Sequence, residues 1–212
     1  MPYNDNNKYH IICWPDDCVV MIGSDEQQMR NEYEISQRLQ CICGFIRYYN
    51  HSYIHIWMPY FPLGCLGFYN WTDIQQFRSC LKQAFLSHKN ALDNGLLHGD
   101  FHAGNVLLKT TKQSQILYDD EFVIETNGLR TWIMDFENTR EIARDEPKDM
   151  IDYYYDIQKF IVGLQDHRFI QKIDRASVVP LLRIISQQNQ MVYPDIQFTK
   201  KILHSIDNIV FV

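Results

Sequence analysis

Residues 97–109 constrain this chain more than any other stretch, because they set polar, chemistry-bearing side chains between apolar residues. They read LHGDFHAGNVLLK and place Asp100 five positions before Asn105. Further along, residues 132–137 read WIMDFE and bring a second acid, Asp135, after an apolar run. Short apolar runs bounded by polar residues are typical of buried strands. We therefore expect three oxygen-bearing side chains to gather on a strand–loop–strand frame.

This set of side chains suits phosphoryl transfer. In that chemistry one carboxylate orients the acceptor hydroxyl and takes its proton, while an Asn oxygen and a second carboxylate hold Mg²⁺ against the ATP phosphates. Mg²⁺ takes oxygen ligands and needs few of them from the protein. We expect Asp100 to be catalytic, and Asn105 and Asp135 to hold the metal and, with it, the cofactor ATP. The alternative is a polar loop whose Asp and Asn cap turns.

Composition and charge narrow the class of protein. The chain has 212 residues, is 46% hydrophobic and carries a formal net charge of -6, so it can bury one sizeable core or two small ones. Without a long basic block, direct nucleic-acid binding is not expected. No apolar run approaches the ~20 residues of a membrane span, and residues 1–7 lack the order of a signal peptide. We expect an intracellular protein, cytoplasmic or nuclear, with no membrane partner.

Six cysteines lie between positions 13 and 80. With no secretory signal they are expected to be reduced core thiols. Cys41 and Cys43 would face the same way on a strand, but a zinc site is not expected because no second Cys/His pair follows at suitable spacing.

The first part of the chain favours a small sheet with one helix. Asp25 or Ser24 is a plausible N-cap for the helix, and Pro15, Asp16 and Asp17 form the turn of a hairpin. The expected strands are residues 9–14, 18–22, 45–50 and 53–60, and the expected helix is residues 25–40.

Two parts customary in a kinase are not visible here. No glycine-rich loop precedes the hairpin, and Met21 stands where the phosphate-binding Lys is expected. Glu32 is the candidate for the carboxylate that normally pairs with that Lys, with a solvated helix charge as the alternative. Lys8 or Arg30 could supply a cation instead. Residues 58–64 would be a hinge that binds the adenine edge, or an ordinary loop.

The later chain favours helices with a few strands between them. Apolar positions at helical spacing include His88, which we expect to be a core histidine. Helices are expected at residues 74–92, 152–161, 179–187 and 198–210, a strand at 106–108, and an extra hairpin at 116–118 and 122–124.

The sequence resembles the haspin-like branch of eukaryotic-type protein kinases. Residues 98–109 are similar at nearly every position to its loop H-R-D-L-H-x-G-N-V-L-L-K, and residues 128–136 follow its G-L-x-x-x-I-x-D-[FY] entry to the metal Asp. Asp156, followed by Ile, fits a later D-I segment that opens the helix supporting the catalytic loop in this family. Gly99 replaces the loop Arg, Glu137 replaces the Gly of the DFG motif, and no A-P-E follows.

The resemblance implies an α+β, protein-kinase-like two-lobe fold, N-terminally trimmed, as a single domain over residues 1–212. Residues 1–60 would be a reduced N-terminal β-lobe, and residues 61–212 a mainly helical C-terminal lobe with the catalytic loop at 98–105 and the metal motif at 135–137. It implies a Ser/Thr protein kinase using ATP and Mg²⁺. Glu32 would then be a cofactor-binding, bracing residue.

Two other functions stay open. A pseudokinase would keep the fold and lose nucleotide clamping, which the missing Lys favours. A small-molecule kinase is suggested because His-Gly-Asp with Asp-Phe-Glu also looks like aminoglycoside and choline phosphotransferases, although those have a shorter link between the motifs.

The expected partner is a protein substrate with a basic Ser/Thr segment. The net charge of -6 and the acids Asp119, Asp120, Glu121, Glu137 and Glu141 would attract it. A solvated acidic face is the alternative.

Overall fold

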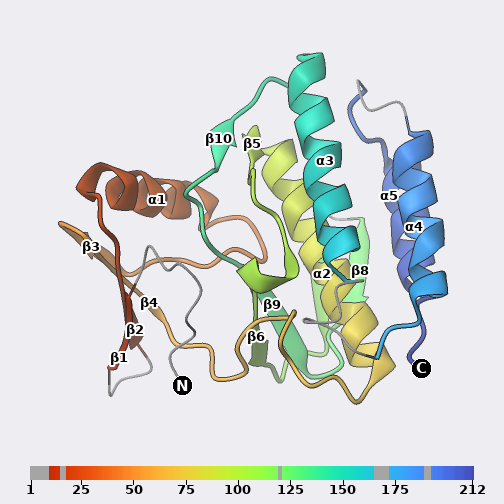
Figure 1. Ribbon diagram of the computed structural model, residues 1–212, viewed down its shortest axis with the longest axis horizontal. Coiled ribbons are helices and arrows are strands. Elements are labelled where there is room, and N and C mark those ends of the chain that lie inside the picture. Colours follow the sequence, from red (N-terminus) through yellow and green to blue (C-terminus); the bar gives the residue numbers. More distant parts are fainter. Residues whose placement is uncertain (1–9, 15–17, 119–120, 165–171, 189–191) are drawn as a thin grey trace.

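The computed structural model describes residues 10–14, 18–118, 121–164, 172–188 and 192–212. It is a mixed α/β structure with small sheets, compatible with the expected α+β class. Figure 1 shows a sheet and one helix at one end of the molecule, and the remaining helices at the other.

The first end is built on an antiparallel four-stranded sheet in the order β1-β2-β4-β3. Its strands are β1 (His10–Trp14), β2 (Cys18–Ile22), β3 (Asn50–Ser52) and β4 (His55–Pro59). Helix α1 (Glu26–Leu39) begins at Asp25, whose carboxylate accepts a hydrogen bond from Gln28 N at 2.7 Å, the usual way to satisfy a free helix amide. Met29 and Leu39 of α1 are buried.

The other end is formed by α2 (Ile74–Asp93), α3 (Pro147–Gly163), α4 (Arg175–Gln187) and α5 (Ile196–Ile206). Phe77, Leu81, Phe85 and Leu92 recur along one side of α2 and are fully buried, as their helical spacing predicts. Helix α2 ends at Asp93 with Asn94 as its C-cap, and Gly95 follows with φ +75. The chain then turns directly into the motif at residues 97–109.

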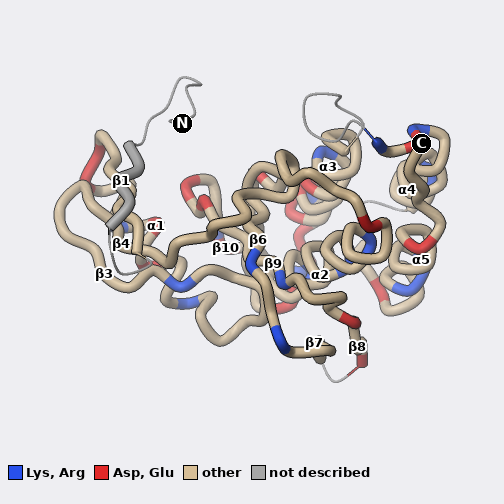
Figure 2. Tube along the Cα trace, turned by 90° about the horizontal axis from the view of Figure 1, so that it is seen from below, with Lys and Arg blue, Asp and Glu red and all other residues tan. Residues whose placement is uncertain are grey.

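The chain also forms short strand pairs outside the four-stranded sheet. β5 (Leu96–Leu97) pairs with β10 (Arg140–Glu141), β6 (Val106–Thr110) pairs with β9 (Leu129–Ile133), and β7 (Gln115–Tyr118) pairs with β8 (Phe122–Glu125). The η1 turn (Ala103–Asn105) leads into β6. The Ser79 hydroxyl of α2 donates to Glu125 O, so the β7–β8 hairpin is held on α2. In Figure 2 this hairpin lies at the edge of the molecule.

The structure corrects the expected strand at residues 45–50. Phe45 forms a single bridge to Ile133, and Ile46 N donates to Ile133 O at 3.0 Å. The start of this segment therefore bonds to the end of β9. Residues 44–49, the crossing segment, run between the two ends of the molecule, and the edge strand of the sheet begins only at Asn50. Cys41 and Cys43 lie in the turn after α1, so their expected placement on a strand is also wrong.

The helix expectations are correct in place and differ at their ends. α3 begins earlier than expected, at Pro147, a residue suited to the first turn of a helix. α4 also begins earlier, at Arg175, because Asp174 caps it, and α5 ends earlier, at Ile206. Within the described residues, no helix has the length and apolar character needed to cross a membrane.

Gly44 provides a test of how closely the crossing segment packs on α2. Gly44 has φ +90, and a Cβ there would lie 1.8 Å from Ser87 Oγ and 2.7 Å from Ser87 Cβ. Gly64 has φ +71 with nothing within 4 Å of such a Cβ. Gly64→Ala should lower the free energy of unfolding by ~1–2 kcal/mol, because alanine disfavours the left-handed backbone. Gly44→Ala should show the same loss and an additional ~1–3 kcal/mol from the clash with Ser87. Urea unfolding measures both, and equal losses would contradict the close approach.

Candidate active site

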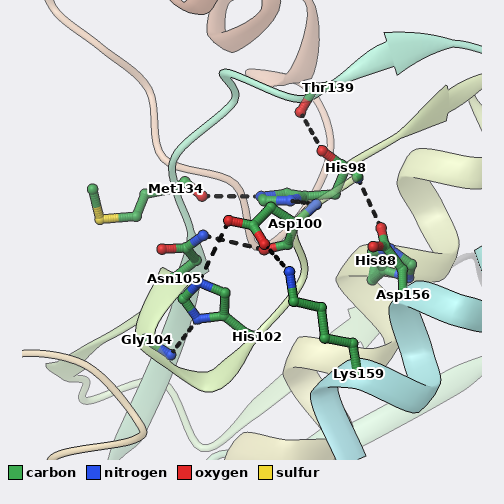
Figure 3. A network of polar contacts seen from close by, with 11 residues as sticks. His88, His98, Asp100, His102, Gly104, Asn105, Met134, Thr139, Asp156 and Lys159 are labelled. Atoms are coloured by element: carbon green, nitrogen blue, oxygen red, sulfur yellow. Dashed lines mark hydrogen bonds and ion pairs between the residues drawn. The ribbon is translucent and has the colours of Figure 1, made fainter. Parts of the chain in front are cut away.

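Asp100, Asn105 and Asp135 lie together, as the sequence predicts. Asp100 is in the loop between β5 and η1, Asn105 is the last residue of η1, and Asp135 follows β9. Asn105 Nδ2 donates to Asp100 O at 3.1 Å, and Met134 N donates to Asn105 O at 3.0 Å. Figure 3 shows the Asn105 amide turned with its nitrogen toward Asp100. The two motifs are therefore joined through Asn105.

Asp135 is held where negative charge accumulates. Its backbone has φ +68, an uncommon conformation for a residue other than glycine. Burial raises the pKa of Asp135, and the neighbouring charges of Asp100 and Glu137 raise it further. A carboxylate disfavoured by burial and by like charges gains from a nearby cation.

The Asp100 carboxylate is held by two nitrogen donors. Lys159 Nζ of α3 donates to Oδ1, and His102 Nε2 lies 3.5 Å from Oδ2. The hydrogen bond from His102 and the contact with Lys159 keep the pKa of Asp100 well below its usual range, although burial opposes this. Asp100 is therefore ionised at neutral pH.

His98 fastens the loop to the end of β9. Its Nε2 lies 3.0 Å from Met134 O, and its Nδ1 lies 3.2 Å from Asp100 N. A neutral ring that donates at Nε2 and accepts at Nδ1 satisfies both contacts. Burial lowers the pKa of His98 to about 4, and the charge of His88 adds to this, so the ring is neutral near pH 7. Thr139 Oγ1 donates to His98 O at 3.2 Å.

Asp156 holds the same loop from α3. Its carboxylate accepts from Gly99 N at 2.8 Å and lies 3.3 Å from His88 Nε2 (Figure 3). Burial alone raises the pKa of Asp156, but the hydrogen bond and charge of His88 bring it below its ordinary value. His88 is a buried core histidine, as expected, with its ring stacked on Phe101 at 4.3 Å.

The backbone conformation at position 99 and its close contact with Asn138 explain why this position holds glycine. Gly99 has φ +78, and a Cβ there would lie 2.5 Å from Asn138 O. Because the obstacle is backbone, no rotamer of a larger residue relieves it. The loop passes close against the segment that follows Asp135 and requires glycine.

Glu32 is buried, so the alternative of a solvated helix charge is wrong. Its Oε1 accepts from the Tyr48 hydroxyl at 2.7 Å and from Phe136 N at 3.4 Å. Burial raises the pKa of Glu32 to about 7, with the charge of Asp135 as a further cause and the hydrogen bond from Tyr48 opposing it. Glu32 thus joins α1 to the residue next to Asp135.

Of the two cations considered from the sequence, Arg30 is the one that the structure describes, and it does not reach the site. Met21 is 2% exposed in β2, opposite Ile56 of β4, and brings no charge. Arg30 is exposed on α1 and pairs with Glu26 at 3.3 Å. Lys8 lies outside the described residues.

The acidic residues expected around the cleft do not form one group. Glu141 pairs with Arg38 at 2.7 Å, and Glu121 lies in the turn of the β7–β8 hairpin on α2. Residues 119–120 are outside the described part of the chain. Among the members that the structure describes, Glu137 is the one whose charge raises the pKa of Asp135.

Sequence reasoning missed Lys159, His102 and Tyr48. Lys159 follows Asp156 by three positions, which puts both on one face of α3. The contact of Lys159 with the loop could therefore have been predicted once Asp156 was linked to the loop. His102 lies inside the motif itself. Tyr48 gives no local signal, because its contact with Glu32 depends on how the crossing segment packs.

Comparison with known proteins does not identify a family for this chain. No model of a known protein family matches the chain, and no curated protein matches it. Among the described residues, no group of three or more His, Cys, Asp or Glu side chains could hold a metal ion by itself. Any metal here would need ligands from Asn105 or from a bound substrate.

Glu32→Gln tests the cost of the buried carboxylate. Because the pKa rises from 4.5 to about 7 on folding, the folded protein keeps a proton that the unfolded chain releases, and stability falls as pH rises through this window. At pH 8 the Gln variant should be more stable than the original protein by up to ~3 kcal/mol, and the difference should vanish near pH 4. Denaturant unfolding at both pH values measures it.

Glu34→Gln is the matched control, since Glu34 lies on the exposed face of the same helix. It should change the free energy of unfolding little at either pH. A Glu32→Gln variant that is less stable at pH 8 would show that the ionised carboxylate is stabilised in the fold.

Proposed function

We propose that this chain is a Ser/Thr protein kinase that transfers the γ-phosphoryl group of ATP to a protein hydroxyl. The observation that carries the proposal is the meeting of Asp100, Asn105 and Asp135, with Glu32 reaching from α1 to the residue after Asp135. A protein-kinase-like two-lobe fold is part of the proposal. The four-stranded sheet with α1 would be the small lobe, and α2–α5 the large lobe.

Asp100 is the proposed catalytic residue. Its ionised carboxylate can orient an acceptor hydroxyl and accept the proton as the new phosphate ester forms. The backbone around it is fixed by His98 and by Asp156 through Gly99 N. This support suits a reaction that depends on positioning.

Asn105 and Asp135 fit a Mg²⁺ ion carried mainly by ATP. The hydrogen bond from Asn105 Nδ2 to Asp100 O leaves the amide oxygen turned to the other side (Figure 3), and Asp135 lies among like charges that a cation would offset. Two protein oxygens are a common number where phosphates complete the ligand set. When bound, Mg²⁺ would neutralise charge on the phosphates.

A pseudokinase is the second candidate, and Met21 favours it. An apolar, buried side chain stands on β2 where a phosphate-binding Lys is expected. A missing unit charge about 4 Å from phosphate is worth up to ~4 kcal/mol at an effective dielectric near 20, which slows transfer without preventing it.

Asp135→Asn tests the metal assignment. With Mg²⁺ and ATP at about 100 times the Kd, the original protein should gain ~2.7 kcal/mol of stability. The variant should lose the Mg²⁺-dependent part of this gain and keep its fold, because Asn has nearly the same shape. Thermal unfolding with ATP, with and without Mg²⁺, measures it. Asp145→Asn, at an exposed acid, is the control, and equal stabilisation by ATP with and without Mg²⁺ would refute the assignment.

Asp100→Ala tests the reaction itself. Loss of the general base should lower transfer by ~10²–10⁴. Acceptors to compare at low and physiological salt are basic Ser/Thr peptides, acidic peptides, and choline- or aminoglycoside-like alcohols. The net charge of -6 favours the basic peptides. Transfer confined to small alcohols would favour the small-molecule kinase, and Mg²⁺-dependent ATP binding without transfer would favour the pseudokinase.

A further inference from the structure

The transferring phosphoryl group needs positive charge that β2 does not provide. Negative charge spreads over the phosphoryl oxygens during transfer, and fixed cations near them account for much of the rate enhancement. Met21 of β2 is apolar and buried. If the proposed function holds, a side-chain cation at the phosphoryl group would come from another element.

Lys159 of α3 is such a cation, already at the reacting position. Its ammonium donates to Asp100 Oδ1, and Figure 3 shows the side chain rising from α3 toward the catalytic loop. Asp156, one helical turn earlier, holds Gly99 N at 2.8 Å. The same face of α3 therefore sets the position of the loop and of the Lys159 ammonium relative to it.

Lys159 also has room to move. Its side chain is 41% exposed, and a pocket of about 240 Å³ beside it is lined by Lys159, Gly163, His102, Ala103 and Gly104. Most of this lining is small. A lysine has a flexible four-carbon stem, so its ammonium can shift from a carboxylate to an adjacent phosphate without a change in the backbone.

Each oxygen of the Asp100 carboxylate has one nitrogen partner, and the departure of one partner would open an acceptor position for a hydroxyl. Lys159 contacts Oδ1, whereas His102 lies 3.5 Å from Oδ2. The terminal phosphate of ATP carries up to two negative charges, whereas a carboxylate carries one, so the phosphate attracts the ammonium more strongly. Arrival of the phosphoryl group would therefore free Oδ1 for the hydroxyl.

We propose that Lys159 is a catalytic residue that leaves Asp100 Oδ1 to contact the phosphoryl oxygens during transfer, in place of the cation missing from β2. This rests on the proposed function. The acceptor oxygen forms a bond to phosphorus, the bond from phosphorus to the bridging oxygen breaks with its electron pair going to ADP, and the hydroxyl proton passes to Asp100. Lys159 stays protonated throughout.

The test compares Lys159→Met and Lys159→Arg with Lys148→Met, an exposed position on the same helix. Lys159→Met should lower kcat by ~10²–10³ and leave the KM for ATP within about twofold, because the contact forms only in transfer. Lys159→Arg should recover part of the loss, and Lys148→Met should match the original protein. Thermal unfolding of each variant without ligand checks the fold.

A binding measurement separates this role from a structural one. ADP and Mg²⁺ with aluminium fluoride imitate the phosphoryl group in transfer, so the original protein should bind this mixture more tightly than ADP and Mg²⁺ alone. Lys159→Met should lose that gain and keep its affinity for ADP and Mg²⁺. Isothermal titration calorimetry measures both affinities.

Each contrary outcome has a distinct meaning. If the original protein binds no nucleotide, the proposed function fails and the role of Lys159 fails with it. Suppose that the original protein transfers phosphate, and that Lys159→Met keeps both its kcat and the tighter binding caused by aluminium fluoride. Only the role of Lys159 is then refuted. A rise in kcat for Lys159→Met also refutes it, because Lys159 would then be an inhibitory clamp on Asp100.

Discussion

The site depends above all on the buried Asp156 carboxylate. A charge removed from water is costly unless hydrogen bonds satisfy it, and Asp156 is satisfied by Gly99 N and His88. His88 is in turn stacked between Phe101 and Tyr153, so the carboxylate links the loop backbone to the aromatic core of the helical end. Removing one partner would leave an unsatisfied buried group. The position of the loop relative to the core is therefore fixed.

The sheet end of the molecule meets this loop at a second buried carboxylate. Glu32 accepts hydrogen bonds from the Tyr48 hydroxyl and Phe136 N, and Phe136 follows Asp135 with its φ of +68. The Tyr48 ring also packs on Phe136, with centroids 5.6 Å apart. Keeping Glu32 here opposes folding near neutral pH, because burial raises its pKa. Local conflicts of this kind are expected where residues are kept for function.

The charges around the loop follow one pattern. Asp100, Asp135 and Glu137 concentrate negative charge, and Lys159 with His102 brings two nitrogen donors against Asp100. A site with excess carboxylate is suited to a substrate that arrives with its own divalent cation, as ATP does. The proposed movement of Lys159 would then let the same ammonium serve Asp100 before the substrate arrives and the phosphoryl group afterwards.

The sequence by itself determined the local parts of this protein. The 74–92 helix, the β7–β8 hairpin and the spacing from Asp100 to Asn105 and Asp135 follow from side-chain periodicity and from residues close together in the chain. Only the tertiary structure decided that Phe45 and Ile46 bond to β9. It also decided that Tyr48 donates to Glu32 and that Lys159 reaches Asp100. These contacts join residues far apart in the chain. The buried Glu32 carboxylate needs a hydrogen-bond partner and finds it in Tyr48, whereas the partly exposed Lys159 reaches Asp100 because α3 packs beside the loop. No local pattern encodes which partner each of them finds.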